Sequence, residues 1–189
     1  MNHNSEGMIL MLDVLKEAIG MLGADEKIEL YGSLRKDLKD SGAIQTYNMI
    51  GEFGERAVIN FYNNSPSLTN LQPAKIGMKC FDVINKYGDR YSIKATTNHQ
   101  TSVFSGLNDK GSALPQKRLF EYVIIVVLDD DMSSKVIYEL DWDDFLSLKK
   151  WHNGKRTWYL SITNELKRKA KILYSVDKAV YNISQHESN

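Results

Sequence analysis

Residues 81–94 have the sequence Phe-Asp-Val-Ile-Asn-Lys-Tyr-Gly-Asp-Arg-Tyr-Ser-Ile-Lys, which predicts two short strands joined by a turn at residues 86–89. Side chains alternate between the two faces of a strand, so Ser92 and Lys94 share one face of the second strand. The turn pairs the strands and brings Asp82 across from Ser92 and Lys94. The sequence therefore places an isolated acid beside an isolated lysine.

A carboxylate beside an amine, at the ends of apolar strands, is the smallest set of groups that metal-assisted hydrolysis of a phosphodiester needs. The acid can hold Mg²⁺, and the lysine can stabilise a developing charge or help to deprotonate water. Each residue also has a simpler structural interpretation. Asp82 can accept hydrogen bonds within the turn, and Lys94 can be an ordinary exposed strand lysine. Their pairing across one hairpin favours the catalytic interpretation.

An acid, a hairpin, a second acidic position, one spacer residue and a lysine form the signature of the PD-(D/E)xK nuclease superfamily, which includes many type II restriction endonucleases. The chain resembles this signature with Asp82, nine intervening residues and Ser92-Ile93-Lys94. It departs from it at two positions, because Phe81 replaces a proline and Ser92 replaces the second acid. The serine is the serious departure, since a hydroxyl is a poorer Mg²⁺ ligand than a carboxylate.

The resemblance implies an α/β (α+β) fold with a restriction-endonuclease-like αβββαβ core, a mixed central sheet and N-terminal helices. It also implies that Asp82 and the backbone carbonyl of Ile93 bind Mg²⁺, for which Mn²⁺ can substitute. Lys94 would orient or activate the attacking water and stabilise the phosphorane, leaving a 5′-phosphate and a 3′-hydroxyl. Ser92 would hold a water of the metal site.

Residues 45–62 resemble the first core helix of the superfamily, with its Gly-Glu element. Their apolar side chains share one face of the predicted helix, and Gly51 and Gly54 lie on or beside that face, where a missing side chain lets a helix approach a sheet closely. Glu55 lies at the edge of this face, and Glu52 points away from it. We therefore expect Glu55 to supplement the metal ligands directly or through water. The alternative is that Glu55 pairs with basic residues on a solvated helix face.

The chain has 189 residues, of which 42% are hydrophobic, and this predicts one domain with a sizeable core. Its parts would be an N-terminal helical part at 1–43, a nuclease-like core at 44–174 and a flexible tail at 175–189. Apolar spacing predicts two helices in the first part, at 8–22 and 25–39. These helices would pack on the core or build a dimer interface.

Beyond the hairpin, the β-branched run at 120–128 predicts a buried central strand, and residues 136–140 predict another. Asp141 can then cap a helix over residues 142–149. No apolar run reaches the roughly 18 to 20 residues that a membrane helix needs, and we find no secretion signal. The lone Cys80 excludes an intramolecular disulfide. We therefore expect a cytoplasmic protein that does not bind a membrane.

The polar segment at 95–116 follows the lysine strand and suits a DNA-contacting loop, with an ordinary mobile loop as the alternative. Four of its side chains can reach phosphates and base edges: Thr97, Asn98, His99 and Gln100. The formal net charge is zero, yet residues 149–171 are strongly basic and residues 121–144 are strongly acidic. The basic stretch includes Lys155 and Arg156 among aromatic residues, a combination suited to contact with nucleic acid.

These observations predict a Mg²⁺-dependent endonuclease of double-stranded DNA, in the first instance a type II restriction endonuclease. A two-fold homodimer is the natural assembly for cutting both strands of a palindrome, and a neighbouring gene for a DNA methyltransferase would be diagnostic. Two alternatives stay open. One is a structure-selective nuclease of the same fold that acts in repair or recombination. The other is a catalytically inactive DNA-binding module in which Ser92 marks a decayed site.

Overall fold

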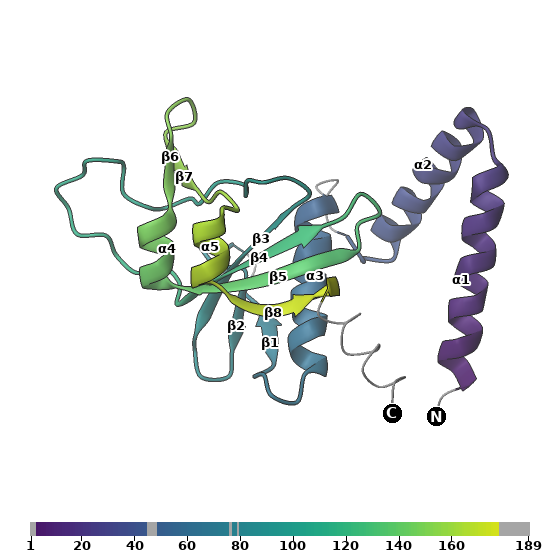
Figure 1. The fold of residues 1–189 in the computed structure, drawn as a ribbon, viewed down its shortest axis with the longest axis horizontal. Helices are drawn as coiled ribbons and strands as arrows, with labels where there is room; N and C mark the ends of the chain where they lie inside the picture. Colours follow the sequence, from purple (N-terminus) through teal and green to yellow (C-terminus); the bar gives the residue numbers. More distant parts are fainter. Residues whose placement is uncertain (1–2, 45–48, 76, 79, 178–189) are drawn as a thin grey trace. The chain divides into compact units, whose positions relative to one another are not determined.

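The computed structural model describes residues 3–44, 49–75, 77–78 and 80–177 (Figure 1). Contacts divide the chain into two compact units, Met1–Tyr47 and Asn48–Asn189. The predicted first residues of the first core helix, 45–48, and most of the predicted tail lie outside the described residues.

The first unit contains two helices, α1 (His3–Met21) and α2 (Ala24–Asp40). Helix α2 ends within one residue of its predicted end. The backbone N–H of Ser41 still donates to the carbonyl of Asp37, whereas the next residue, Gly42, has a φ of +72°. That left-handed conformation suits glycine and stops the helix.

The second unit is built on a six-stranded mixed sheet with the order β1-β2-β3-β4-β5-β8. Its strands are β1 (Leu71–Pro73), β2 (Val83–Asn85), β3 (Arg90–Thr96), β4 (Tyr122–Leu128), β5 (Ser134–Asp141) and β8 (Lys171–Ser175). Strands β3 and β4 are parallel, and the other neighbours in this sheet pair antiparallel. The remaining elements are α3 (Met49–Asn64), α4 (Trp142–Leu148), α5 (Asn164–Lys169), and a separate hairpin of β6 (Lys150–His152) and β7 (Thr157–Tyr159). The mixed sheet with several helices confirms the predicted α+β class.

Strand β4 lies at the centre of the sheet and is buried on both faces, as its uniform apolar run predicts. Val123 and Ile125 point into a cluster with α4 and α5, whereas Ile124 and Val126 point into a second cluster with α3. All four are 0% exposed. The sheet is therefore the middle layer of three, because helices cover both of its faces.

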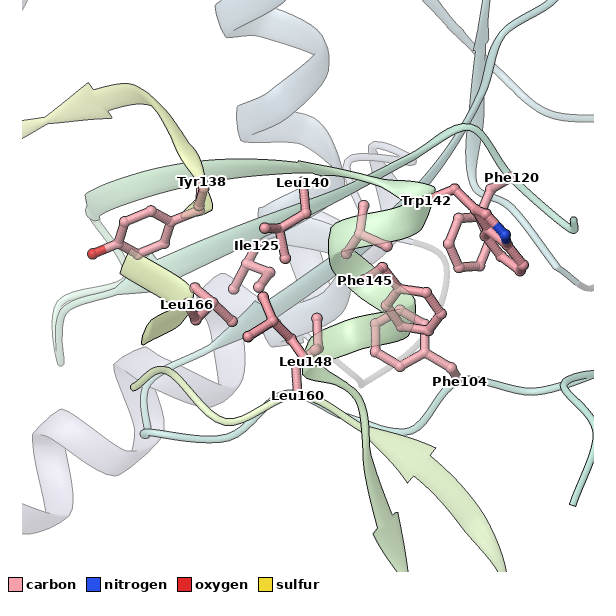
Figure 2. Packing of buried hydrophobic residues seen from close by; sticks show 12 residues of the cluster. Phe104, Phe120, Ile125, Tyr138, Leu140, Trp142, Phe145, Leu148, Leu160 and Leu166 are labelled. Carbon is pink, nitrogen blue, oxygen red and sulfur yellow. The ribbon is translucent and has the colours of Figure 1, made fainter. Parts of the chain in front are cut away.

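The cluster beneath α4 combines aromatic and aliphatic side chains (Figure 2). The ring of Phe145 lies 4.7 Å from that of Phe104, and Phe120 lies 5.0 Å from Trp142, measured between centroids. Helix α4 begins as predicted, since the side chain of Asp141 accepts a hydrogen bond of 2.8 Å from the backbone N–H three residues later. Phe104 joins this core from the connection between β3 and β4.

The predicted hairpin at residues 81–94 is present as β2 and β3. Its register pairs Val83 with Tyr91, and Gly88 has a φ of +90° in the turn. Asp82 comes immediately before β2, and its backbone N–H donates to the carbonyl of Tyr91 at 2.8 Å. Asp82 is therefore held level with the middle of β3.

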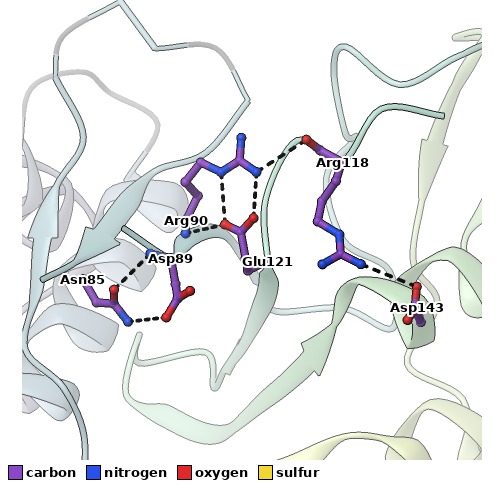
Figure 3. Close-up of polar contacts among 6 residues, drawn as sticks. All are labelled: Asn85, Asp89, Arg90, Arg118, Glu121 and Asp143. Atoms are coloured by element: carbon purple, nitrogen blue, oxygen red, sulfur yellow. Dashed lines mark hydrogen bonds and ion pairs between the residues drawn. The ribbon is translucent and has the colours of Figure 1, made fainter. Parts of the chain in front are cut away.

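An ion pair fixes the parallel register of β3 and β4 (Figure 3). Arg90 Nη2 lies 2.7 Å from Glu121 Oε1, while Arg90 Nε and its backbone N–H donate to Oε2 at 3.0 Å and 2.8 Å. The hydrogen bonds from Arg90 lower the pKa of Glu121. Residues 97–121, all of which the structure describes, contain no helix. This pair therefore ties the far end of a long irregular connection to the start of β3.

Helix α3 approaches β3 closely at Gly54. A Cβ placed on Gly54 would lie 2.2 Å from the Cβ of Ala95, a distance that real Cβ contacts do not show. The predicted close approach of this helix to the sheet is thus confirmed at Gly54. Because the next residue is Glu55, the same contact sets the position of the candidate helix acid.

We expect Gly54→Ala to lower the free energy of unfolding by about 1–3 kcal/mol, because α3 must move away from β3 to admit the methyl group. Urea denaturation measures this loss. Combining it with Ala95→Gly should recover part of the loss, giving a coupling between the two positions. Gly20→Ala is the control, since a Cβ there meets no atom within 4 Å. Purely additive effects at positions 54 and 95 would contradict the contact.

Candidate active site

The structure brings three of the four predicted catalytic residues to one cavity of about 300 Å³. Asp82 comes immediately before β2, Lys94 from β3, and Glu55 from α3. Glu52 is not among the residues that line this cavity. The two carboxylates and the lysine therefore meet although they come from three separate elements.

Asp82 is fastened to β3 through one carboxylate oxygen. Its Oδ2 accepts a hydrogen bond of 2.6 Å from the backbone N–H of Ile93 and a longer one of 3.4 Å from the Ser92 hydroxyl. Neither bond uses Oδ1. In an extended strand the N–H and C=O of one residue point to the same side, so the carbonyl of Ile93 also faces the edge where Asp82 lies.

Glu55 has a pKa raised from 4.5 to about 7. Burial is the largest cause, followed by the negative charge of Asp82; Lys94 opposes the shift and Glu52 adds to it. Two carboxylates that share a partly buried cavity disfavour each other's ionised forms. When both acids are ionised, the site carries more negative charge than its single lysine balances, and that state favours a cation.

Lys94 lies over an aromatic ring. Its Nζ is 5.3 Å from the ring centroid of Phe104, which is only 2% exposed. The backbone N–H of Phe104 donates to Trp158 at 2.8 Å, so the ring has a fixed position beneath the ammonium group. Phe104 lies in a stretch without periodicity, and no local pattern in the sequence identifies it as a neighbour of Lys94.

Ser92 lies behind Asp82 and is 3% exposed. It lines a second cavity of about 40 Å³ together with Cys80, Asp82 and Lys94, and it is not among the residues that line the larger one. A volume near 40 Å³ has room for about one water molecule. The Ser92 hydroxyl, at the position where the resemblance predicts an acid, therefore contacts Asp82.

The loop after β3 begins with an ordered turn. The hydroxyl of Thr96 accepts from the N–H of Asn98 at 3.0 Å and donates to the carbonyl of Gln100 at 2.7 Å. Thr97 and Asn98 line the 300 Å³ cavity, and together with His99 they also line a larger cavity of about 410 Å³ beside β5 and β8. Gln100 is exposed and is not among the lining residues of either cavity.

Lys155 and Arg156 lie in the turn of the β6–β7 hairpin, and neither lines the 300 Å³ cavity. Both are exposed, and Arg156 Nη2 lies 2.7 Å from Asp109 Oδ2. The hairpin is also held at its base, where Trp158 Nε1 donates to the carbonyl of Asn108 at 2.7 Å. The basic turn is thus attached to the same connection that supplies Phe104.

The acidic and basic stretches of the sequence partly meet in the fold. Lys169 Nζ lies 3.1 Å from Asp144, and Lys171 Nζ lies 3.5 Å from Glu139. These two lysines of the basic stretch therefore lie beside residues of the acidic stretch, although the two stretches are separate in the sequence. Lys149 instead lies with its Nζ 3.8 Å from the ring centroid of Trp158.

The donor set near Asp82 suits a hard cation that keeps part of its own coordination shell. Within the part of the chain that the structure describes, no three His, Cys, Asp or Glu side chains gather into a ready metal site. Mg²⁺ usually binds through one or two carboxylates plus water and substrate phosphates. Asp82, Glu55 and the carbonyl of Ile93 fit that requirement.

Comparison with known proteins finds no family whose sequence pattern matches the chain, and no curated protein that matches it. Among the described helices, none is long and apolar enough to cross a membrane.

We expect Glu55 to make stability depend on pH. Between about pH 4.5 and 7 the folded protein keeps Glu55 protonated while the unfolded chain ionises it, so stability is lost as pH rises from 4.5 through 7. Glu55→Gln should remove this loss, which urea denaturation at pH 5 and pH 8 measures. Glu165→Gln, at an exposed glutamate, serves as the control. Equal pH dependence in the Glu55→Gln variant and the unchanged protein would contradict the raised pKa.

Proposed function

We propose that the chain is a Mg²⁺-dependent endonuclease that hydrolyses phosphodiester bonds of double-stranded DNA, in the first instance as a type II restriction endonuclease. The observation that supports this most is the meeting of Asp82, Glu55 and Lys94 in one cavity of about 300 Å³. We propose a restriction-endonuclease-like core on related grounds. Helix α3 packs on β3, the strands β1 to β3 pair antiparallel, and β4 joins parallel to β3.

Asp82, Glu55 and the carbonyl of Ile93 are the groups that would hold Mg²⁺ or Mn²⁺. When bound, such a cation stabilises negative charge on the phosphate and makes water more acidic. Ser92 and the N–H of Ile93 restrain Oδ2 of Asp82, so the carboxylate keeps one orientation toward the cavity.

The chain's own residues then position the reaction. The ammonium of Lys94, held over Phe104, would stabilise the negative charge that develops on the pentacovalent phosphorus. Lys94 would also orient or activate the attacking water. Glu55 would act at the metal site, directly or through a water molecule.

The proposed DNA contacts fall in two places. Thr97 and Asn98 border the cavity, with His99 and Gln100 following in the same turn. The β6–β7 hairpin carries exposed basic side chains in its turn. A two-stranded ribbon fits the major groove of B-form DNA, which is about 12 Å wide. Bound DNA would then place a phosphate in the cavity and its major groove around the β6–β7 hairpin, so it would contact both surfaces.

A homodimer and a cognate DNA methyltransferase are the partners that a restriction enzyme requires.

A cleavage assay tests the proposal. We expect unmethylated phage DNA with Mg²⁺ to give discrete fragments, and Asp82→Ala or Lys94→Ala to lower the rate by about 10²–10⁴-fold. Lys86→Ala, at an exposed lysine of the β2–β3 turn, should cleave normally. A smear that both site variants abolish would favour the structure-selective nuclease. DNA binding without cleavage in Mg²⁺ or Mn²⁺ would identify a binding module and make Ser92 the decisive departure.

Lys155→Ala and Arg156→Ala should weaken DNA binding about equally for all sequences. Each lost phosphate contact lowers the slope of log K against log salt concentration by about 1. Fluorescence anisotropy at several salt concentrations measures this slope. Lys135→Ala is a matched control, because that exposed lysine pairs with Asp129 at 3.0 Å. An unchanged slope in both hairpin variants would remove the hairpin from the interface.

A further inference from the structure

A cavity of about 250 Å³, here called the tyrosine cavity, lies beside the carboxyl end of α3. Its described lining includes tyrosines from α3, the β2–β3 turn, β3 and β4: Tyr62, Tyr87, Tyr91 and Tyr122. Tyr62 lies seven residues beyond Glu55 on α3, so two turns of helix, about 10 Å, separate the two positions. No described residue lines both this cavity and the candidate active site.

Three of these tyrosine rings form a packed row. Tyr91 stacks on Tyr122 with 5.0 Å between the ring centroids, and Tyr62 meets Tyr91 edge-on at 5.9 Å. Tyr62 and Tyr91 are only 2% and 5% exposed, so the row is held in place by the core. The faces of aromatic rings are negative and attract cations. A cavity lined by such rings therefore suits an organic cation better than an anion.

Two carboxylates add negative charge to this cavity. Glu139, whose side chain is 14% exposed, accepts a hydrogen bond from the hydroxyl of Tyr62. Asp89 Oδ2 accepts one of 2.8 Å from Asn85 Nδ2 (Figure 3), which also donates to the hydroxyl of Tyr91 at 3.2 Å. Both donors are neutral groups. These hydrogen bonds therefore fix the carboxylates without balancing their charge.

The cavity has a basic side chain that balances this charge only in part. Lys171 Nζ lies 3.5 Å from Glu139 Oε1, and the lysine side chain is 63% exposed. An ion pair so long and so exposed contributes little to stability. Among the described lining residues Lys171 is the only basic one, so with Asp89 and Glu139 ionised the lining carries a net charge of −1.

The negative charge acts on the whole row of rings. Burial is the largest cause that raises the pKa of Tyr62, Tyr91 and Tyr122, and the charge of Glu139 raises all three further. A field that disfavours a tyrosinate favours a bound cation. Helix α3 adds to this field, because the carboxyl end of a helix carries partial negative charge.

The positions of the two carboxylates indicate the shape of the ligand. Asp89 directly precedes β3, whereas Glu139 lies on β5 and is level with Ile93, since both pair with Ile124 of β4. The backbones of the two acids are therefore about 10 Å apart across the strands and about 13 Å apart along them. Their side chains are too short to bring both carboxylates to one ammonium group. On the sheet, the stacked tyrosine pair lies between the two acids.

We propose that the tyrosine cavity binds a linear alkyl polyamine. One ammonium group pairs with Asp89 and another with Glu139, while the alkyl chain between them lies against the rings of Tyr91 and Tyr122. The ligand takes the place of Lys171 beside Glu139. The inference goes beyond the proposed nuclease function and does not depend on it, because the cavity is separate from the candidate active site.

Isothermal titration calorimetry of the full chain without DNA, with spermidine as the titrant, tests the site. We expect one spermidine per chain, and Glu139→Gln or Asp89→Asn should each weaken binding at least about tenfold by removing a charge partner. Glu165→Gln removes the same charge from an exposed position outside the cavity and should bind normally. Asp82→Ala should also bind normally, which distinguishes this cavity from the candidate active site. Circular dichroism checks that each variant is folded.

Lys171→Gln should have the opposite effect. Removing the competing ammonium group should tighten spermidine binding about fivefold, the effect of one charge at about 4 Å in water. A residue that only supported the fold would not tighten binding when it is replaced. Unchanged or weaker binding by this variant would contradict the predicted place of the ligand beside Glu139.

Two other cations test the chemistry of the ligand. n-Butylamine carries a single ammonium group and should bind at least about tenfold more weakly than spermidine. Mg²⁺ at equal ionic strength should not displace spermidine. No spermidine binding at millimolar concentration, or equal binding by Glu139→Gln and the unchanged protein, would overturn the proposal. Displacement by Mg²⁺ would overturn it in favour of an inorganic cation, and n-butylamine that binds as tightly as spermidine would overturn the arrangement of two ammonium groups.

Discussion

The contact between Gly54 and Ala95 is the constraint on which the site depends. It lets the backbone of α3 lie directly against β3, so that Glu55 and Lys94, each next to a contact residue, reach the same cavity. Asp82 joins them because the N–H of Ile93 holds its carboxylate. A single methyl group at position 54 would separate the helix acid from the strand residues. The close packing of α3 on β3 is therefore also what brings the site residues together.

The electrostatics of the cavity follow from that packing. Burial beside Asp82 raises the pKa of Glu55 to about 7, and Lys94 compensates only part of the negative charge. Such an arrangement costs stability when both acids are ionised, and a divalent cation would relieve the cost. This is why we interpret the cluster as a functional site. An ordinary structural ion pair balances its charges within the fold, as Arg90 and Glu121 do.

Long segments without regular structure are ordered here by a few specific contacts. The connection from β3 to β4 is held by Arg90 and Glu121 at one end and by Trp158 and Asn108 in its middle. Phe104 then anchors it in the aromatic cluster beneath α4. The first unit shows the opposite case. Helices α1 and α2 are regular, yet several of their large apolar side chains, such as Leu10 and Leu34, are exposed.

The sequence by itself determined the local elements. Alternation and the turn glycine Gly88 specify the hairpin, a β-branched run specifies β4, and Asp141 specifies the start of α4, because each signal acts within a few residues of the chain. Even the close approach of α3 follows from a glycine on its apolar face. The three-residue strand β1 carries no comparable local signal, because it is short and contains Pro73.

Only the tertiary structure decided which distant side chains meet. It brought Glu55 of α3 into the cavity of Asp82 and Lys94, and it placed Phe104 beneath Lys94. It also brought lysines of the basic stretch to acids that are far away in sequence. These outcomes depend on the register of six strands and on how closely helices pack against them. Burial, and with it the pKa of Glu55, is a property of that whole packing and is not encoded at any single position.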